Sequence, residues 1–306
     1  MIALNFKNID ELKDMHYKAI LSHVNAHLTP KDIASLYANV ITLPGFEGYP
    51  AKYNAKTDNY TWLKEFILAD FNTLKKWVAI CATKLRFQQF KTIYLTKFSN
   101  GYDNFVDTEN TYNAYVLLEK MDISVCPYCE HEFFEIVEID DVKRRTCEFD
   151  HFFPKGDANY PALAMCFYNL VPSCIPCNRL KKTRFVTASP YSSDIEKQSF
   201  LYPDLEIGVN METVKQEDCC VQFHAMGDMV VNEKTLALEQ RYAHLAPNIY
   251  HLLKKRQQYP EEKLEEMERL GINTKEQLLL DFFGNPREKA KGKELHTKMK
   301  QDLIGY

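Results

Sequence analysis

Four of the nine cysteines occur as two C-x-x-C pairs, which are Cys126 with Cys129 and Cys174 with Cys177. Each pair can present two thiolates from a tight turn, and four thiolates satisfy one tetrahedral Zn²⁺ ion. His131 follows the first pair, but a site with four thiolates is already filled, so we expect this side chain to be exposed. Four unrelated buried thiols are the alternative. The spacing favours a structural zinc held by the four cysteines.

The segment between the two pairs contains residues suited to acid–base and metal chemistry. Asp150 and His151 end a strand-like run, and Asn178 directly follows the second pair. A histidine can remove a proton from water because its ordinary pKa lies near neutral pH. The oxygens of Asp150 and Asn178 suit Mg²⁺ or Mn²⁺. Alternation along a strand places Glu148 on the same face as Asp150, either as a further ligand or as a solvated or salt-bridged carboxylate.

The polar residues fall into three short motifs framed by the cysteine pairs: Asp150-His151, Asn169-Leu170 and Cys177-Asn178. Their order, spacing and framing resemble those of the HNH, or ββα-metal, endonucleases. In the letters of that motif, Asp150 stands where the family name has its first histidine and Asn178 where it has its last. Both exchanges retain a metal-binding atom.

The resemblance implies a metal-dependent hydrolase of DNA phosphodiester bonds. His151 would be the general base, Asp150 and Asn178 would hold the catalytic Mg²⁺ or Mn²⁺, and Asn169 would orient the histidine and its loop. Hydrolysis of a phosphodiester needs an activated water and a cation to balance charge in the transition state, and these residue types can supply both.

Positive charge is concentrated beside the same motifs. Four basic side chains are candidates to contact backbone phosphates: Lys155, Arg179, Lys181 and Lys182. Such contacts position a nucleic acid without reading its sequence. A solvated helix face is the alternative interpretation of the run after Asn178.

A finer resemblance links the sequence around Asp150 and Asn169 to nuclease subunits of Septu-type anti-phage defence systems. It implies an ATPase partner, and because the chain lacks a P-loop motif, ATP hydrolysis would belong to that partner. Two other interpretations of the function stay open. One is an RNA-cleaving HNH toxin, and the other is a non-catalytic zinc module that binds nucleic acid or a partner protein.

The elements that must position these residues predict an α+β protein. We expect a mostly helical chain with a small central ββα core stapled by the zinc. Its segments are an N-terminal helical domain over 1–120, the nuclease core over 121–185, and a mixed, mainly helical region over 186–306. Residues 133–139 and 142–149 are predicted to form a β-hairpin, because strand-like runs flank Asp140-Asp141.

Local signals mark several other elements. Thr29-Pro30 with Asp32 predicts a capped helix start, and so do the motifs at 273–276 and 285–288. Apolar periodicity predicts one long helix over 62–85. Residues 219–223 and 229–231 are predicted to form strands.

Composition excludes several classes of protein. The chain of 306 residues is 45% hydrophobic and 26% charged, which excludes collagen-like and largely disordered proteins. Its net charge of −4 excludes binding to nucleic acid by bulk charge alone. An odd number of cysteines with uneven spacing argues against a secreted disulfide scaffold. Without a visible targeting or membrane segment, the expected compartment is the cytoplasm.

Overall fold

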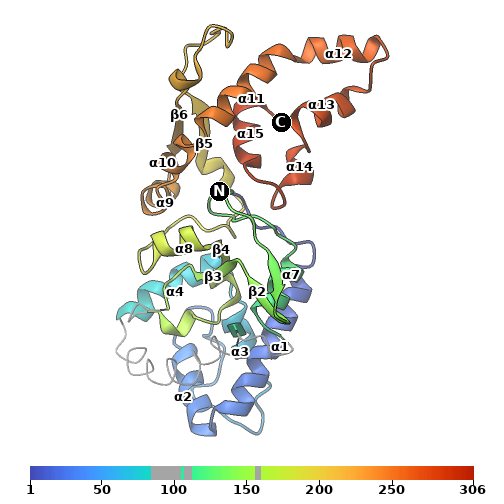
Figure 1. Cartoon of the computed structure of the whole chain (residues 1–306). Helices are drawn as coiled ribbons and strands as arrows, with labels where there is room; N and C mark the ends of the chain where they lie inside the picture. Colours follow the sequence, from blue (N-terminus) through green and yellow to red (C-terminus); the bar gives the residue numbers. More distant parts are fainter. Residues whose placement is uncertain (84–104, 107–111, 156–159) are drawn as a thin grey trace. The chain divides into compact units, whose positions relative to one another are not determined.

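The computed structural model describes residues 1–83, 105–106, 112–155 and 160–306. Among these residues, helices predominate and the named strands form three antiparallel sheets of two strands each (Figure 1). The predicted α+β class is therefore confirmed. End residues of the helix expected over 62–85, Lys84 and Leu85, lie outside the described part of the chain.

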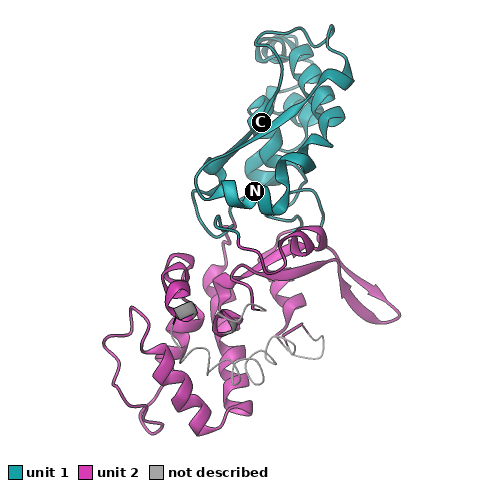
Figure 2. Ribbon diagram, turned by 90° about the vertical axis from the view of Figure 1, so that its left-hand side faces the viewer, with its two compact units in different colours: residues 1–3, 124–133, 186–306 teal, residues 4–123, 134–185 magenta. Residues whose placement is uncertain are grey.

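The chain divides into two compact units, shown in different colours in Figure 2. One unit contains residues 4–123 and 134–185, and the other contains residues 1–3, 124–133 and 186–306. One unit boundary falls after residue 185, where the sequence places the end of the nuclease core. Of the segment predicted as the core, residues 121–123 and 134–185 fall in the unit that contains the preceding helices, and residues 124–133 fall in the other unit.

The unit with residues 4–123 and 134–185 begins with helices. Its described longer helices before the strands are α1 (Ile9–His27), α2 (Pro30–Val40), α3 (Thr61–Ile67), α4 (Phe71–Thr83) and α7 (Ala114–Met121). At the start of α2, Thr29 and Asp32 form the predicted capping box: the Asp32 amide donates to Thr29 Oγ1 (3.3 Å) and the Thr29 amide donates to Asp32 Oδ2 (2.9 Å).

The single helix expected over 62–85 is wrong, because a break after Ile67 separates α3 from α4. Asp70 explains the break: its carboxylate accepts a hydrogen bond from the Thr73 amide (2.7 Å) and so starts a second helix. The start of α4 bears directly on the site, since Phe71 packs edge-on against Phe152 and stacks on Phe153, the two residues after His151.

Two strand pairs of this unit follow α7. Strands β1 (Ile136–Ile139) and β2 (Val142–Arg145) form the predicted hairpin across Asp140 and Asp141, both of which adopt positive φ, as its tight turn requires. The second predicted strand is divided at Thr146, whose amide donates to Glu135 O (2.9 Å). Strand β3 (Cys147–His151) then pairs with β4 (Leu170–Cys174) instead of with β1, and α8 (Ile175–Lys181) follows.

The other unit combines one strand pair with helices. Its elements are β5 (Ser199–Pro203), β6 (Val221–Ala225), α9 (Met229–Leu236), α10 (Leu238–Ala243), α11 (Ala246–Gln258), α12 (Glu261–Arg269), α13 (Lys275–Phe283), α14 (Arg287–Ala290) and α15 (Thr297–Ile304). The strand expected at 219–223 corresponds to β6. The one expected at 229–231 is wrong, because these residues begin α9 and the run is too short to show helical periodicity.

The helix starts predicted near residues 273 and 285 both occur. Thr274 Oγ1 accepts from the Gln277 amide (3.2 Å) at the start of α13, whereas α14 begins at Arg287 without the predicted side-chain cap, because Pro286 occupies the capping position. Arg287 is buried and pairs with Glu196 at 2.5 Å. Lys291 also pairs with Glu196, and Lys298 pairs with Asp302, so several cations in this part of the chain are engaged within the protein.

Candidate functional site

A hairpin and the helix after it organise the residues that the sequence singled out. In the pairing of β3 with β4, Cys147 lies opposite Cys174, and His151 lies opposite Leu170. All five residues of β4 are buried, so this strand anchors the hairpin in the interior. Helix α8 begins directly after β4 and carries Asn178 (Figure 1), so Cys174 is the last residue of the strand and Cys177 lies in the first turn of the helix.

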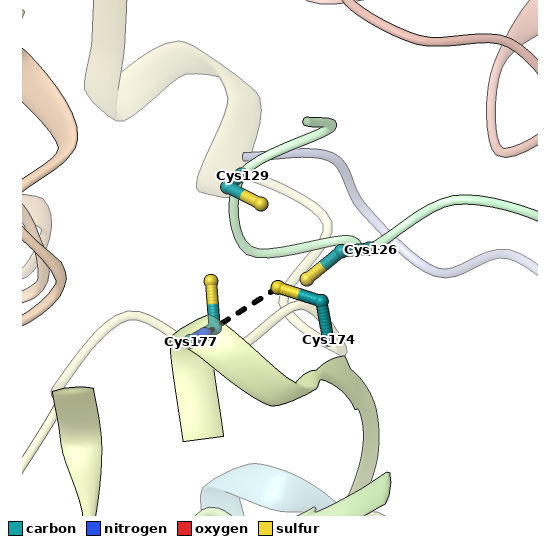
Figure 3. A group of neighbouring side chains, drawn as sticks. All are labelled: Cys126, Cys129, Cys174 and Cys177. Carbon is teal, nitrogen blue, oxygen red and sulfur yellow. Dashed lines mark hydrogen bonds between the residues drawn. The ribbon is translucent and has the colours of Figure 1, made fainter. Parts of the chain in front are cut away.

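The four cysteines of the two C-x-x-C pairs form one buried cluster. Figure 3 shows their side chains gathered around one point, and their sulfur atoms all lie within 4.8 Å of one another. Zn–S bonds of about 2.3 Å in a tetrahedron separate sulfurs by about 3.8 Å, so the cluster is compatible with a bound Zn²⁺. The Cys177 amide donates to Cys174 Sγ at 3.4 Å, as expected where α8 starts at a thiolate.

His131 does not belong to this cluster, although it is half-buried rather than exposed. Its Nδ1 lies 2.6 Å from the carbonyl oxygen of Cys129, and its ring meets those of Tyr242 and His296 edge-on.

Cys147 is buried opposite Cys174, and burial raises the pKa of its thiol to about 12. It is therefore a protonated core residue at neutral pH.

His151 ends β3 in a buried position. Its Nε2 lies 3.0 Å from the carbonyl oxygen of Ala164, and because a carbonyl can only accept, Nε2 carries the proton and Nδ1 is the basic atom of the neutral ring. Burial lowers the pKa of His151 to about 3, helped by the positive charges of Lys155 and Lys181 and opposed by the bond to Ala164. The ring is therefore neutral at pH 7.

Asn169 braces the loop that follows His151. Its Nδ2 donates to the carbonyl oxygens of Phe153 (3.1 Å) and Leu163 (2.9 Å), and its Oδ1 accepts from the Phe153 amide (2.7 Å). This buried amide ties the start of the loop to its end, which is a geometry suited to the orienting role expected for Asn169.

Asp150 forms a buried ion pair that the sequence did not reveal. Its Oδ1 lies 3.0 Å from Nζ of Lys181, and the same ammonium group donates to the carbonyl oxygen of His151 (2.7 Å). Lys181 is fully buried, so its assignment as a phosphate contact is wrong. It lies three residues after Asn178 and four after Cys177, and this spacing turns it to the inner face of α8 rather than to solvent.

A cavity of about 390 Å³ lies over the hairpin and α8. Its lining includes Glu148, Asp150, His151, Lys155, Asn178 and Lys182. The structure thus brings both proposed metal ligands, the proposed base and two of the proposed phosphate contacts to one place. Arg179, on the exposed side of α8, is not among the residues that line this cavity.

Two further residues complete the site. The exposed Glu148 carboxylate accepts a hydrogen bond from Nδ2 of Asn178, so the two side chains meet across β3 and α8. Arg145, at the end of β2, also lines the cavity and stacks its guanidinium group over the ring of Tyr115 at 5.3 Å. The sequence reasoning missed Arg145, whose signal is the basic run Lys143-Arg144-Arg145 just before β3.

Comparison with known proteins gave no match to a family, to a characterised sequence or to a solved structure. The function must therefore be argued from the residues of the site. Among the described residues, no helix combines the length and apolar character needed to cross a membrane.

Proposed function

We propose that this chain is a metal-dependent HNH endonuclease that hydrolyses phosphodiester bonds in DNA. The observation that carries the proposal is the 3.0 Å contact between Nε2 of His151 and the carbonyl oxygen of Ala164, from which the tautomer follows because a carbonyl can only accept. The Nε2–H of His151 is committed to Ala164 O, which makes Nδ1 the basic atom on a ring that lines a cavity shared with Asp150 and Asn178. A buried neutral imidazole beside oxygen ligands is suited to activating water for phosphodiester cleavage.

In this reaction, Nδ1 of His151 takes a proton from a water molecule as the water oxygen bonds to phosphorus. The bond from phosphorus to the leaving sugar oxygen breaks, and that oxygen takes a proton from solvent. Lys155 and Lys182, which line the same cavity, supply positive charge for the phosphate. The anionic phosphate offsets the lysine charges that lower the pKa of His151, so it makes His151 a stronger base.

The residues at the cavity fit a hard divalent cation. Asp150 and Asn178 would hold it, with Glu148 as a further ligand, and their donors are oxygens of the kind that Mg²⁺ and Mn²⁺ prefer. Because Lys181 already balances the charge of Asp150, the exposed carboxylate of Glu148 is well placed to complete the donor set. When bound, the cation would offset charge that develops on the phosphate in the transition state.

The zinc has a separate role in this proposal. Four thiolates would fill a tetrahedral site and leave no position for water or substrate, so a zinc held there would be structural. Since Asn178 follows Cys177 directly, the metal cluster would also fix where the Asn178 amide points.

We further propose that the chain acts as an anti-phage defence effector with an ATPase partner. The support is the resemblance around Asp150 and Asn169, together with a net charge of −4, which is compatible with protein partners. Co-purification of the full chain from its native host tests this part: an ATPase is expected in the eluate, and repeated recovery without one contradicts it.

Incubation with supercoiled plasmid and, separately, with total RNA tests the substrate. Each is treated with purified protein in Mg²⁺, Mn²⁺ or EDTA. We expect metal-dependent nicking of DNA and intact RNA. Cleavage of RNA alone would instead identify a ribonuclease, and binding without cleavage of either would favour a non-catalytic zinc module.

A further inference from the structure

Three successive carbonyl groups of the loop between β3 and β4 each face a buried polar side chain. The three pairs are Leu163 O with Asn169 Nδ2 at 2.9 Å, Ala164 O with His151 Nε2 at 3.0 Å, and Met165 O with His16 Nε2 at 2.7 Å. The middle carbonyl sets the tautomer of the proposed base. The pairs on either side hold that carbonyl in place.

His16 reaches this loop from helix α1, which is far away in the sequence. The side chain is fully buried, and its Nδ1 lies 2.8 Å from the hydroxyl of Tyr112. Because Met165 O can only accept, Nε2 of His16 carries the proton, and Nδ1 accepts from the Tyr112 hydroxyl. The rings of Phe105 and Phe167 meet the imidazole edge-on and restrict its rotation.

This orientation of His16 is well determined by its surroundings. Burial lowers its pKa to about 4, so the ring is neutral at pH 7 and makes one donor and one acceptor contact. An apolar residue could fill the same volume, but it would leave the carbonyl of Met165 without this donor. One of the two polar contacts of His16 is therefore made to residue 165, next to the carbonyl that binds His151.

We propose that His16 is a positioning residue for His151, a role that rests on the proposed nuclease function. With residues 163 and 165 both tied to buried side chains, the carbonyl of Ala164 cannot swing away from Nε2 of His151. The imidazole then keeps one tautomer and one direction, and Nδ1 stays aimed for proton removal. His16 touches neither substrate nor metal in this scheme.

The test compares His16→Leu with His16→Gln in the full-length zinc-loaded protein. Leucine fills the site without a donor, whereas the Gln side-chain amide can replace the Nε2 donor. We expect His16→Leu to lower kcat about 10-fold or more with little change in KM, because a misdirected base affects the chemical step more than binding. His16→Gln should recover most of this loss.

A spectroscopic measurement keeps the positioning role testable even without cleavage. In protein labelled with ¹⁵N at histidine, the Nε2–H proton of His151 should give a protected signal, assigned by its loss in His151→Ala. That signal should disappear or move in His16→Leu and return in His16→Gln. Tyr112→Phe provides a milder change, since it removes only the donor to Nδ1, and it should give an intermediate shift.

Leu36→Ala is the matched control for lost stability. Leu36 is buried in helix α2 of the same unit, and its truncation leaves a cavity without removing a polar contact to the loop. We expect its folded fraction to keep the wild-type kcat and His151 signal. A folded His16→Leu protein with both properties unchanged would overturn the proposal.

Two separate measurements distinguish failure of the nuclease function from failure of the positioning role: cleavage by the wild type and the His151 signal. If wild-type protein cleaves no nucleic acid in Mg²⁺ or Mn²⁺, the nuclease proposal fails, and the His151 signal alone decides the relationship to His16. A signal that persists in His16→Leu overturns the relationship. A signal that is lost there and restored by His16→Gln supports it.

Discussion

Lys181 and Asp150 form an ion pair in which neither side chain has more than 3% of its surface exposed, with Nζ and Oδ1 3.0 Å apart. The same ammonium group binds the carbonyl of His151. The inner face of α8 is thereby tied to the last two residues of β3. One buried cation thus holds a proposed metal ligand and the proposed base in a fixed relationship.

Removing one partner of this pair should be strongly destabilising. Lys181→Met leaves the Asp150 carboxylate buried without its cation, and we expect a loss of about 3–5 kcal/mol in the free energy of unfolding, measured by urea denaturation. The double variant Lys181→Met/Asp150→Leu removes both charges and should recover much of that loss. Equal stability of the single variant and the wild type would show that the pair does not form.

The cysteine cluster should contribute directly to folding. Cys126→Ala removes one of four buried ligands, so we expect a lower zinc content and a lower melting temperature, measured by elemental analysis and calorimetry. Cys220→Ala is the matched control because Cys220 is exposed. If Cys126→Ala kept one zinc per chain and its full stability, the assignment of four thiolate ligands would be incorrect.

Acid should destabilise the protein partly through His16. Its pKa is lowered from 6.5 to about 4 in the folded chain, so the unfolded chain binds more protons between these values. Neutral His16 therefore makes its full contribution to the free energy of unfolding above pH 6.5. As the pH falls to about 4, this contribution decreases by about 3 kcal/mol. Urea titrations of wild type and His16→Gln at several pH values should show a smaller loss for the variant. Parallel curves would contradict this origin.

Lys182 should contribute to DNA binding through its charge. It is exposed and lines the cavity, whereas its neighbour Lys181 is buried. We expect Lys182→Ala to weaken DNA binding for all sequences and to reduce the slope of log K against log salt by about 1. Lys76→Ala, at an exposed position on α4, is the control and should leave the slope unchanged.

Short-range patterns in the sequence predicted their structures well. The two C-x-x-C pairs gave the cysteine cluster, Thr29 and Asp32 gave a capping box, and Asp140-Asp141 gave a hairpin turn. Each of these features depends on residues a few positions apart or on a metal-ligand spacing with few alternatives. Local chemistry is sufficient to determine them.

Long-range contacts could not be predicted in the same way. Lys181 read as one more cation in a basic run, because only the folded hairpin brings Asp150 to it. His16 gave no signal at all, since its partner at residue 165 is 149 positions away. At residues 68–70, apolar periodicity favoured a continuous helix, but the Asp70 carboxylate caps a new helix there and the helix is interrupted.

The most direct test of the central claim is plasmid cleavage by wild type and His151→Ala, compared in Mg²⁺ or Mn²⁺. His151→Gln serves as a second variant, and far-UV circular dichroism and zinc content confirm that each protein is folded. We expect the wild type to nick DNA and both variants to lose this activity by at least 100-fold while they retain fold and zinc. Cleavage at the wild-type rate by folded His151→Ala would contradict the account.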